Sequence, residues 1–217
     1  HTRSIWVTGV QTCALPILDH LSPALPVDLV GHSMGGNVAM LYSGIRPQRV
    51  RRLISLEGFG LTSTVPDEAP TRYREWLDEL KQSSQFSTYD SFEQFAQVLA
   101  RRNPRTGADQ LDFIARSWAR QRSDGRIELC ADARHKRVNP VLYQREQAEA
   151  CWEQITAPVL FVTGDQSELG RRMADSGVAE KLGMSGEVTT ASIADAGHMM
   201  HHERPAAVAE LIEGFLR

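Results

Sequence analysis

The stretch Gly31-His32-Ser33-Met34-Gly35 constrains the fold of this chain more than any other part of the sequence. It follows a short apolar run that ends at Val30, and helix-forming residues follow it over 36–45. A G-x-S-x-G turn between a strand and a helix exposes a serine hydroxyl, and it leaves little room for a side chain at either glycine because the two backbones approach closely. We therefore interpret Ser33 as a candidate nucleophile on a sharp turn. The alternative is a glycine-rich turn with an incidental serine.

Length, composition and charge favour one soluble globular domain. The chain has 217 residues, of which 41% are hydrophobic, so it can bury a sizeable core. Its net charge is −3 and its basic residues are scattered, so we expect neither nucleic acid nor a membrane as a partner. The three cysteines lack metal-ligand spacing, which favours a reducing, cytoplasmic location without a metal site.

Residues 7–17, with the sequence VTGVQTCALPI, resemble the translation of a common DNA sequencing adapter. We therefore treat residues 1–17 as an artefact and expect the authentic sequence to begin near Leu18. The alternative is a natural N-terminal strand over 5–10. On the artefact interpretation, neither a start methionine nor a secretion signal can be read from this chain.

Apolar runs with polar or glycine ends predict the strands of a parallel α/β sheet. The predicted strands cover 27–31, 53–57, 158–164 and 187–193, and helices are predicted over 168–182 and 204–216. We expect the second of these strands to lie beside the first. The sheet domain would then consist of residues 18–60 and 156–217.

Residues 61–155 are rich in aromatic and charged residues, and we predict an all-helical cap inserted between two strands of the sheet. Apolar residues at helical spacing predict helices over 71–80, 89–101 and 108–120, each with a stripe that packs in a core or lid. The stripe of the first helix consists of Tyr73, Trp76, Leu77 and Leu80. Ser123-Asp124-Gly125 predicts a turn.

The candidate chemistry lies just after the predicted strands, because open α/β sheets bind ligands at the carboxyl ends of their strands. These ends offer a serine, two carboxylates and a histidine: Ser33, Glu57, Asp165 and His198. Their order along the chain is serine, acid, histidine. G-x-S-x-G hydrolases use the same order.

The motifs GHSMGG, PVLFVTGD and AGHMMHHERP, together with the helical insert, resemble the α/β-hydrolase superfamily over residues 18–217. The resemblance covers the second part of that fold, so it implies part of a parallel sheet with a helical cap. It also implies Ser33 as the nucleophile, His198 as the general base and the backbone N–H of Met34 as one oxyanion donor. The sequence has neither a metal-ligand cluster nor a dinucleotide-binding glycine motif, so we expect no cofactor.

His198 is our preferred base because it follows a glycine on a strand-end loop, from which an imidazole can reach a serine on the neighbouring turn. Its competitors are His20, His32, His135, His201 and His202. We expect His32 to point away from the attacking face. We expect His201 and His202 to face solvent or to pack at a helix start.

The acid remains open between three carboxylates. In the commonest family pattern it occupies the position of Ser167, and a serine cannot orient an imidazolium. Glu57 ends the strand beside the Ser33 strand, a location that some members of the superfamily use, so we prefer it to Asp165 and then to Glu168. The other interpretation of Glu57 is a strand-end carboxylate that caps backbone N–H groups.

We expect a serine hydrolase that cleaves a carboxylic ester or a related acyl compound through an acyl-enzyme, with a small-molecule acyl substrate as its partner. A serine at position 33 argues against the branches that attack with a carboxylate. One alternative is a catalytically incompetent fragment, unstable or nearly inactive because it lacks the earlier strands and the second oxyanion donor. Another is a non-catalytic binding protein on the same scaffold. The sequence does not specify the oligomeric state.

Overall fold

The computed structural model describes residues 17–176, 184 and 186–217, and these residues form two compact units. The sheet unit consists of the described residues within 17–66, 141–200 and 204–217, and the insert unit consists of Asp67–Pro140 and His201–Glu203. Two predicted segments lie outside the described residues. They are positions 7–16 of the adapter-like segment and positions 177–182 of the helix predicted over 168–182.

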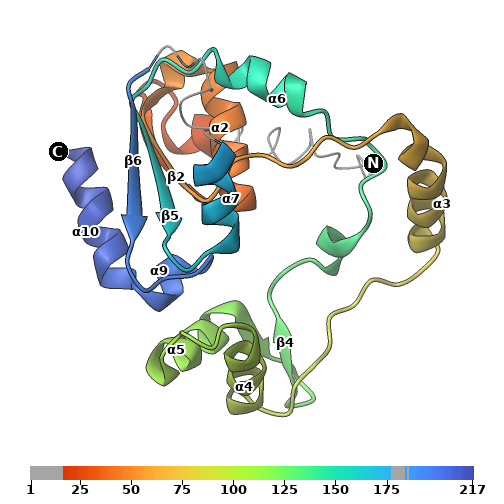
Figure 1. Ribbon diagram of the computed structural model, residues 1–217. Helices are drawn as coiled ribbons and strands as arrows, with labels where there is room; N and C mark the ends of the chain where they lie inside the picture. Colours follow the sequence, from red (N-terminus) through yellow and green to blue (C-terminus); the bar gives the residue numbers. More distant parts are fainter. Residues whose placement is uncertain (1–16, 177–183, 185) are drawn as a thin grey trace. The chain divides into compact units, whose positions relative to one another are not determined.

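A parallel sheet forms the centre of the sheet unit (Figure 1). In the described part of the chain it has four strands in the order β1-β2-β5-β6. The strands are β1 (Val27–His32), β2 (Val50–Leu56), β5 (Val159–Gly164) and β6 (Val188–Ile193). All four predicted strands are therefore confirmed, and β2 lies directly beside β1 as expected.

The strand β5 is buried except at Thr163, and β2 is buried from Leu53 to Leu56, because helices cover both faces of the sheet. Successive side chains of a strand point to opposite faces, so Leu53 and Phe161 lie in one core cluster while Ile54 and Leu160 lie in the other. The first face is covered by α2 (Met34–Ile45) and α6 (Arg145–Trp152), and the second by α10 (Pro205–Leu216) (Figure 1). This unit also contains η1 (Pro47–Arg49) and α7 (Glu168–Ser176), and α9 (Met200–Glu203) begins in it with Met200 and continues in the insert unit.

Two helices, α4 (Phe92–Arg102) and α5 (Ala108–Trp118), pack against each other and build the small core of the insert unit. Their apolar stripes contribute Phe95, Leu99, Leu111 and Ile114, which are all buried. The packing predicted for the two stripes is confirmed at these positions, but Trp118, which the predicted stripe of the second helix includes, is 43% exposed. The unit also contains α3 (Ala69–Leu80), η2 (Pro66–Glu68) and η3 (Ala133–Lys136).

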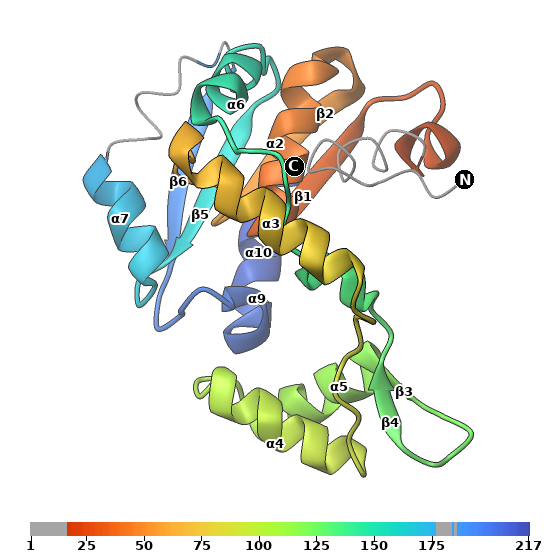
Figure 2. The ribbon, with the colours of Figure 1, turned by 90° about the vertical axis from the view of Figure 1, so that its right-hand side faces the viewer.

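The prediction of an all-helical insert is wrong, because two short strands follow α5 (Figure 2). They are β3 (Ala119–Gln121) and β4 (Ile127–Leu129), which pair antiparallel. The predicted turn at 123–125 closes this hairpin, and Gly125 supplies the positive φ of 83°. Each strand has three residues. Such a length is too short for an alternating pattern to compete with the helical spacing that precedes it.

The stripe of α3 does not lie in a core. The side chains of Tyr73, Leu77 and Leu80 are 49%, 51% and 46% exposed, and α3 has no buried residue. The helix itself is confirmed, but the packing predicted for its stripe is not found. Helical spacing identifies a face of a helix and does not determine whether that face is covered.

Candidate active site

Ser33 lies between β1 and α2 in a strained backbone conformation, with φ 52° and ψ −117°. Residues other than glycine rarely adopt a positive φ, and each such residue costs on the order of 1–3 kcal/mol. The N–H of Ser33 donates to the carbonyl oxygen of Leu56 on β2 at 2.8 Å, so the neighbouring strand holds the turn. The turn places the serine at the carboxyl end of β1.

The glycines of the turn differ in how much room they leave for a side chain. A Cβ at Gly31 would lie 2.4 Å from the carbonyl oxygen of Gly35, so the close approach predicted at Gly31 is confirmed. The same prediction for Gly35 is wrong, because a Cβ there would meet nothing within 4 Å. Gly36 is the second tight position, since its Cβ would lie 2.9 Å from the Cα of Gly58. The reason is that α2 crosses the chain after β2 on the side of Gly36, whereas Gly35 is exposed.

His198 lies on the loop between β6 and α9 and joins two of the other candidate residues. Its Nε2 lies 3.0 Å from Oγ of Ser33, and its Nδ1 lies 2.6 Å from Oε2 of Glu57. The structure therefore brings Ser33, His198 and Glu57 together from the ends of three different strands.

Glu57 directly follows β2 and is 1% exposed. Its Oε1 accepts from the N–H of Gly164 at 2.9 Å, and its Oε2 accepts from Oγ of Ser167 at 2.8 Å. Burial by itself raises the pKa of Glu57, but the hydrogen bonds from His198, Gly164 and Ser167 outweigh it and hold the pKa below its ordinary value. The carboxylate is therefore ionised at neutral pH.

The protons in this chain of hydrogen bonds follow from that charge. An ionised carboxylate only accepts, so Nδ1 of His198 carries the proton and donates it to Glu57. Nε2 is then free of a proton and accepts from the hydroxyl of Ser33. Such an arrangement can remove the serine proton while the serine oxygen attacks an electrophile.

The other two candidate acids occupy different environments. Asp165 is exposed, and its Oδ1 accepts from the backbone N–H of Ala196 at 3.2 Å. Backbone hydrogen bonds, the one from Asp195 foremost, lower the pKa of Asp165. Glu168 is the first residue of α7. Asp165 thus holds the loop that precedes His198, whereas Glu57 contacts the imidazole itself.

His32 is a residue whose contact the sequence did not predict. Its Nε2 donates to the carbonyl oxygen of His198 at 2.7 Å, and the two rings lie 4.7 Å apart between centroids. Burial is the main cause that lowers the pKa of His32. The expectation that His32 points away therefore needs correction, because His32 ties the turn to the His198 loop.

The remaining histidines are found elsewhere. His20 and His135 are exposed. His201 and His202 belong to the insert unit, are half-buried and lie 4.0 Å apart between ring centroids.

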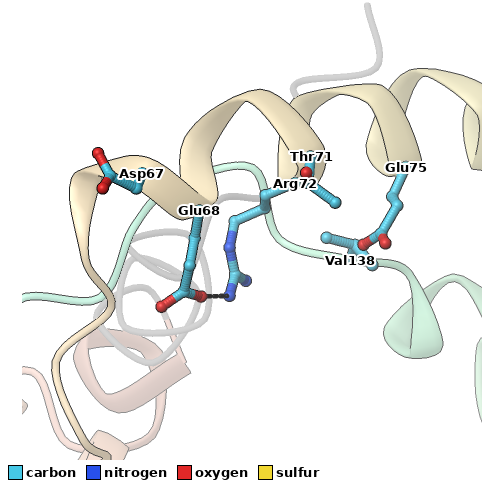
Figure 3. Close-up of a pocket in the computed structure, with 6 residues that line it drawn as sticks. All are labelled: Asp67, Glu68, Thr71, Arg72, Glu75 and Val138. Atoms are coloured by element: carbon cyan, nitrogen blue, oxygen red, sulfur yellow. Dashed lines mark hydrogen bonds and ion pairs between the residues drawn. The ribbon is translucent and has the colours of Figure 1, made fainter.

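The insert unit has a hollow lined mostly by polar side chains (Figure 3). In the described residues, its lining shows no pair of a nucleophile and a base in contact with each other. It is lined by Asp67, Glu68, Thr71, Arg72, Glu75 and Val138. Glu68 and Arg72 form an ion pair of 3.2 Å across one turn of α3. The other acidic side chains lie at the surface, as is usual for a solvated helix face.

Comparison with known proteins identifies the family. Residues 6–211 match the sequence model of the alpha/beta hydrolase family. The chain belongs to the alpha/beta hydrolase family. The fold class implied by the sequence motifs is thereby confirmed, with the parallel sheet β1-β2-β5-β6 as part of the hydrolase fold.

Individual relatives of this alpha/beta hydrolase are distant. A serine hydrolase-like protein of Danio rerio is 23% identical over 196 residues, which cover 87% of this chain and 60% of the relative. The chain thus spans 60% of the length of that relative.

Two solved structures illustrate the likeness in fold. A thioesterase domain from the curacin biosynthetic pathway is 23% identical with a TM-score of 0.80, over 97% of this chain and 74% of that chain. A novel esterase from Mycobacterium tuberculosis is 16% identical with a TM-score of 0.69, and the match covers 95% of this chain and 66% of the esterase. At these identities the likeness concerns the fold alone. No helix in the described residues is long and apolar enough to span a membrane.

Proposed function

We propose that this alpha/beta hydrolase cleaves a carboxylic ester or a related small acyl compound through an acyl-enzyme formed on Ser33. The observation that supports this function best is the continuous hydrogen-bond chain from Ser33 through His198 to the buried carboxylate of Glu57. A serine, an imidazole and an ionised acid in this order supply a nucleophile, a general base and a group that fixes the tautomer of the base.

The proposed reaction has two halves. Oγ of Ser33 attacks the acyl carbon while Nε2 of His198 takes the serine proton, and the leaving group departs with that proton. Water then attacks the acyl-enzyme, again with His198 as the base, and Ser33 regains its proton. Glu57 stays ionised throughout and stabilises the imidazolium.

We assign one oxyanion contact to the backbone N–H of Met34. Met34 is the first residue of α2, and the first N–H groups of a helix have no partner within the helix. They also carry the positive end of the helix dipole, so a developing oxyanion beside Ser33 would be stabilised there.

We also propose that residues 61–155 act as a cap that selects the acyl group, with aromatic side chains that favour a small or medium apolar one. This proposal rests on their place in the chain between β2 and β5 and on the thioester and ester chemistry named for the two structural neighbours.

The function is tested by hydrolysis of a p-nitrophenyl ester by the protein and by its Ser33→Ala variant. We expect kcat to fall by about 10⁶-fold in the variant, because nucleophile and base act as a unit. Ser117→Ala is the matched control, since Ser117 is an exposed serine of α5 that bonds only the helix turn before it. Equal rates for the protein and Ser33→Ala would contradict the proposal and favour an incompetent fragment or a binding protein.

A further inference from the structure

Ser167 lies on the loop between β5 and α7 and is 3% exposed. Its Oγ accepts from the backbone N–H of Gly170 at 3.2 Å. The same Oγ lies 2.8 Å from Oε2 of Glu57, to which it donates its hydroxyl proton. The hydroxyl is therefore oriented by the start of α7 and directed at the carboxylate.

The oxygen that accepts from Ser167 is the one that faces the imidazole. Oε2 of Glu57 accepts hydrogen bonds from Oγ of Ser167 and from Nδ1 of His198. Oε1 accepts one from the N–H of Gly164. Three donors, two from loops and one from the end of β5, thus fix the plane of the carboxylate. Two of the donors, Ser167 and His198, bond the same negatively charged oxygen, Oε2.

We propose that Ser167 is a positioning residue that fixes Oε2 of Glu57 against His198 and withdraws part of the charge which that oxygen presents to the imidazole. This inference rests on the proposed function of Ser33, His198 and Glu57. Ser167 is excluded as the triad acid because a serine cannot orient an imidazolium. The inference gives its side chain a different role, which acts through Glu57.

A pH dependence follows from the shared oxygen. Without the Ser167 hydroxyl, Oε2 presents more charge to His198, so the protonated imidazole is favoured and persists to higher pH. In the part of the chain that the structure describes, His32 also lies against this pair, because its Nε2 donates to the carbonyl oxygen of His198. Because His32 also donates in its neutral form, its titration leaves this contact in place.

The geometry also predicts that the acid can move to position 167. An aspartate carboxylate extends one bond further than a serine hydroxyl, and Oγ of Ser167 is 2.8 Å from Oε2. A carboxylate at position 167 would therefore reach about 1.2 Å further toward the present position of Oε2, and it would face His198 across the space that opens once Glu57 is shortened. The N–H of Gly170, which now bonds Oγ, would remain available to it.

The first test is the pH profile of kcat/KM for the protein and for Ser167→Ala. We expect the highest value of kcat/KM to fall by about tenfold, as for the loss of one hydrogen bond to a charged group, and the acidic limb to move up by about half a pH unit. A variant whose rate falls equally at every pH would overturn the proposal, because a merely structural loss does not move the limb.

The second test compares the exchange Glu57→Ser with Ser167→Asp against Glu57→Ser with Ser167→Asn. We expect the first pair to be at least about 100-fold more active, because only a carboxylate stabilises the imidazolium. Equal activity of two folded pairs would contradict the exchange, and if neither pair folds the Ser167→Ala profile decides. A failure of the proposed function is recognised separately, since the unsubstituted protein and Ser33→Ala would then hydrolyse esters equally.

Discussion

Polar side chains gather at the strand ends of the sheet unit and in the hollow of the insert unit. The two regions differ in the backbone conformation and the burial of these residues. In the described residues other than glycine, positive φ angles occur at Ser33, Glu57 and Asp195, at the carboxyl ends of β1, β2 and β6. The acidic residues of the hollow lie exposed on η2 and α3, in regular helical backbone. Crowded polar groups are therefore a weaker mark of a functional site than backbone strain combined with buried hydrogen bonds.

We expect the largest difference in activity from substitutions of the carboxylates in the two regions. We expect Glu57→Gln to lower kcat by about 10⁴-fold, because an amide cannot stabilise the imidazolium and favours the wrong tautomer. We expect little change from Asp165→Asn, since Asp165 holds a backbone N–H, and none from Glu75→Gln in the hollow. Steady-state kinetics on the three variants measure this, and a dead Asp165→Asn would show that the wrong carboxylate is assigned.

The glycines of the Ser33 turn give a smaller effect, on stability. We expect Gly31→Ala to lower the free energy of unfolding by several kcal/mol or to prevent folding, because its Cβ would lie 2.4 Å from a backbone oxygen. Gly35→Ala should be neutral or stabilising by up to about 1 kcal/mol, since the site is open and helical. Urea unfolding measures both, and equal losses would mean that the backbones cross differently.

The smallest effect concerns the pH dependence of stability. The pKa of Glu57 lies below its ordinary value of 4.5, so the ionised carboxylate stabilises the folded state above pH 4.5. This contribution is lost as the pH falls from 4.5 through the lower pKa of the folded state. We therefore expect the protein to lose stability more steeply than Glu57→Gln when urea unfolding is followed from pH 7 to pH 3.5. Parallel curves would show that the three donors do not favour the charged form.

The two inner strands, β2 and β5, could be predicted from the sequence most directly, because a segment buried on both faces of a sheet appears as an apolar run. The convergence of Ser33, Glu57 and His198 could be expected for the same reason, since residues that follow parallel strands share one edge of the sheet. Glu57 could be ranked first only through the resemblance to a family. No local pattern distinguishes it from Asp165.

The features that the sequence did not predict depend on contacts between distant segments. His32 bonds a carbonyl 166 positions away, and Ser167 bonds a carboxylate 110 positions away. The spare room at Gly35 depends on which side of α2 faces Gly58. The hairpin β3–β4 was missed for a local reason, because three residues carry no readable period.

The most direct test of the central claim is the reaction of the protein with a fluorophosphonate probe, followed by mass spectrometry of the labelled peptides. We expect a single adduct on Oγ of Ser33, formed far more slowly in His198→Gln, because the probe reacts only with a serine whose proton a base removes. A folded protein that forms no adduct at Ser33, or that labels equally fast without His198, would contradict the account.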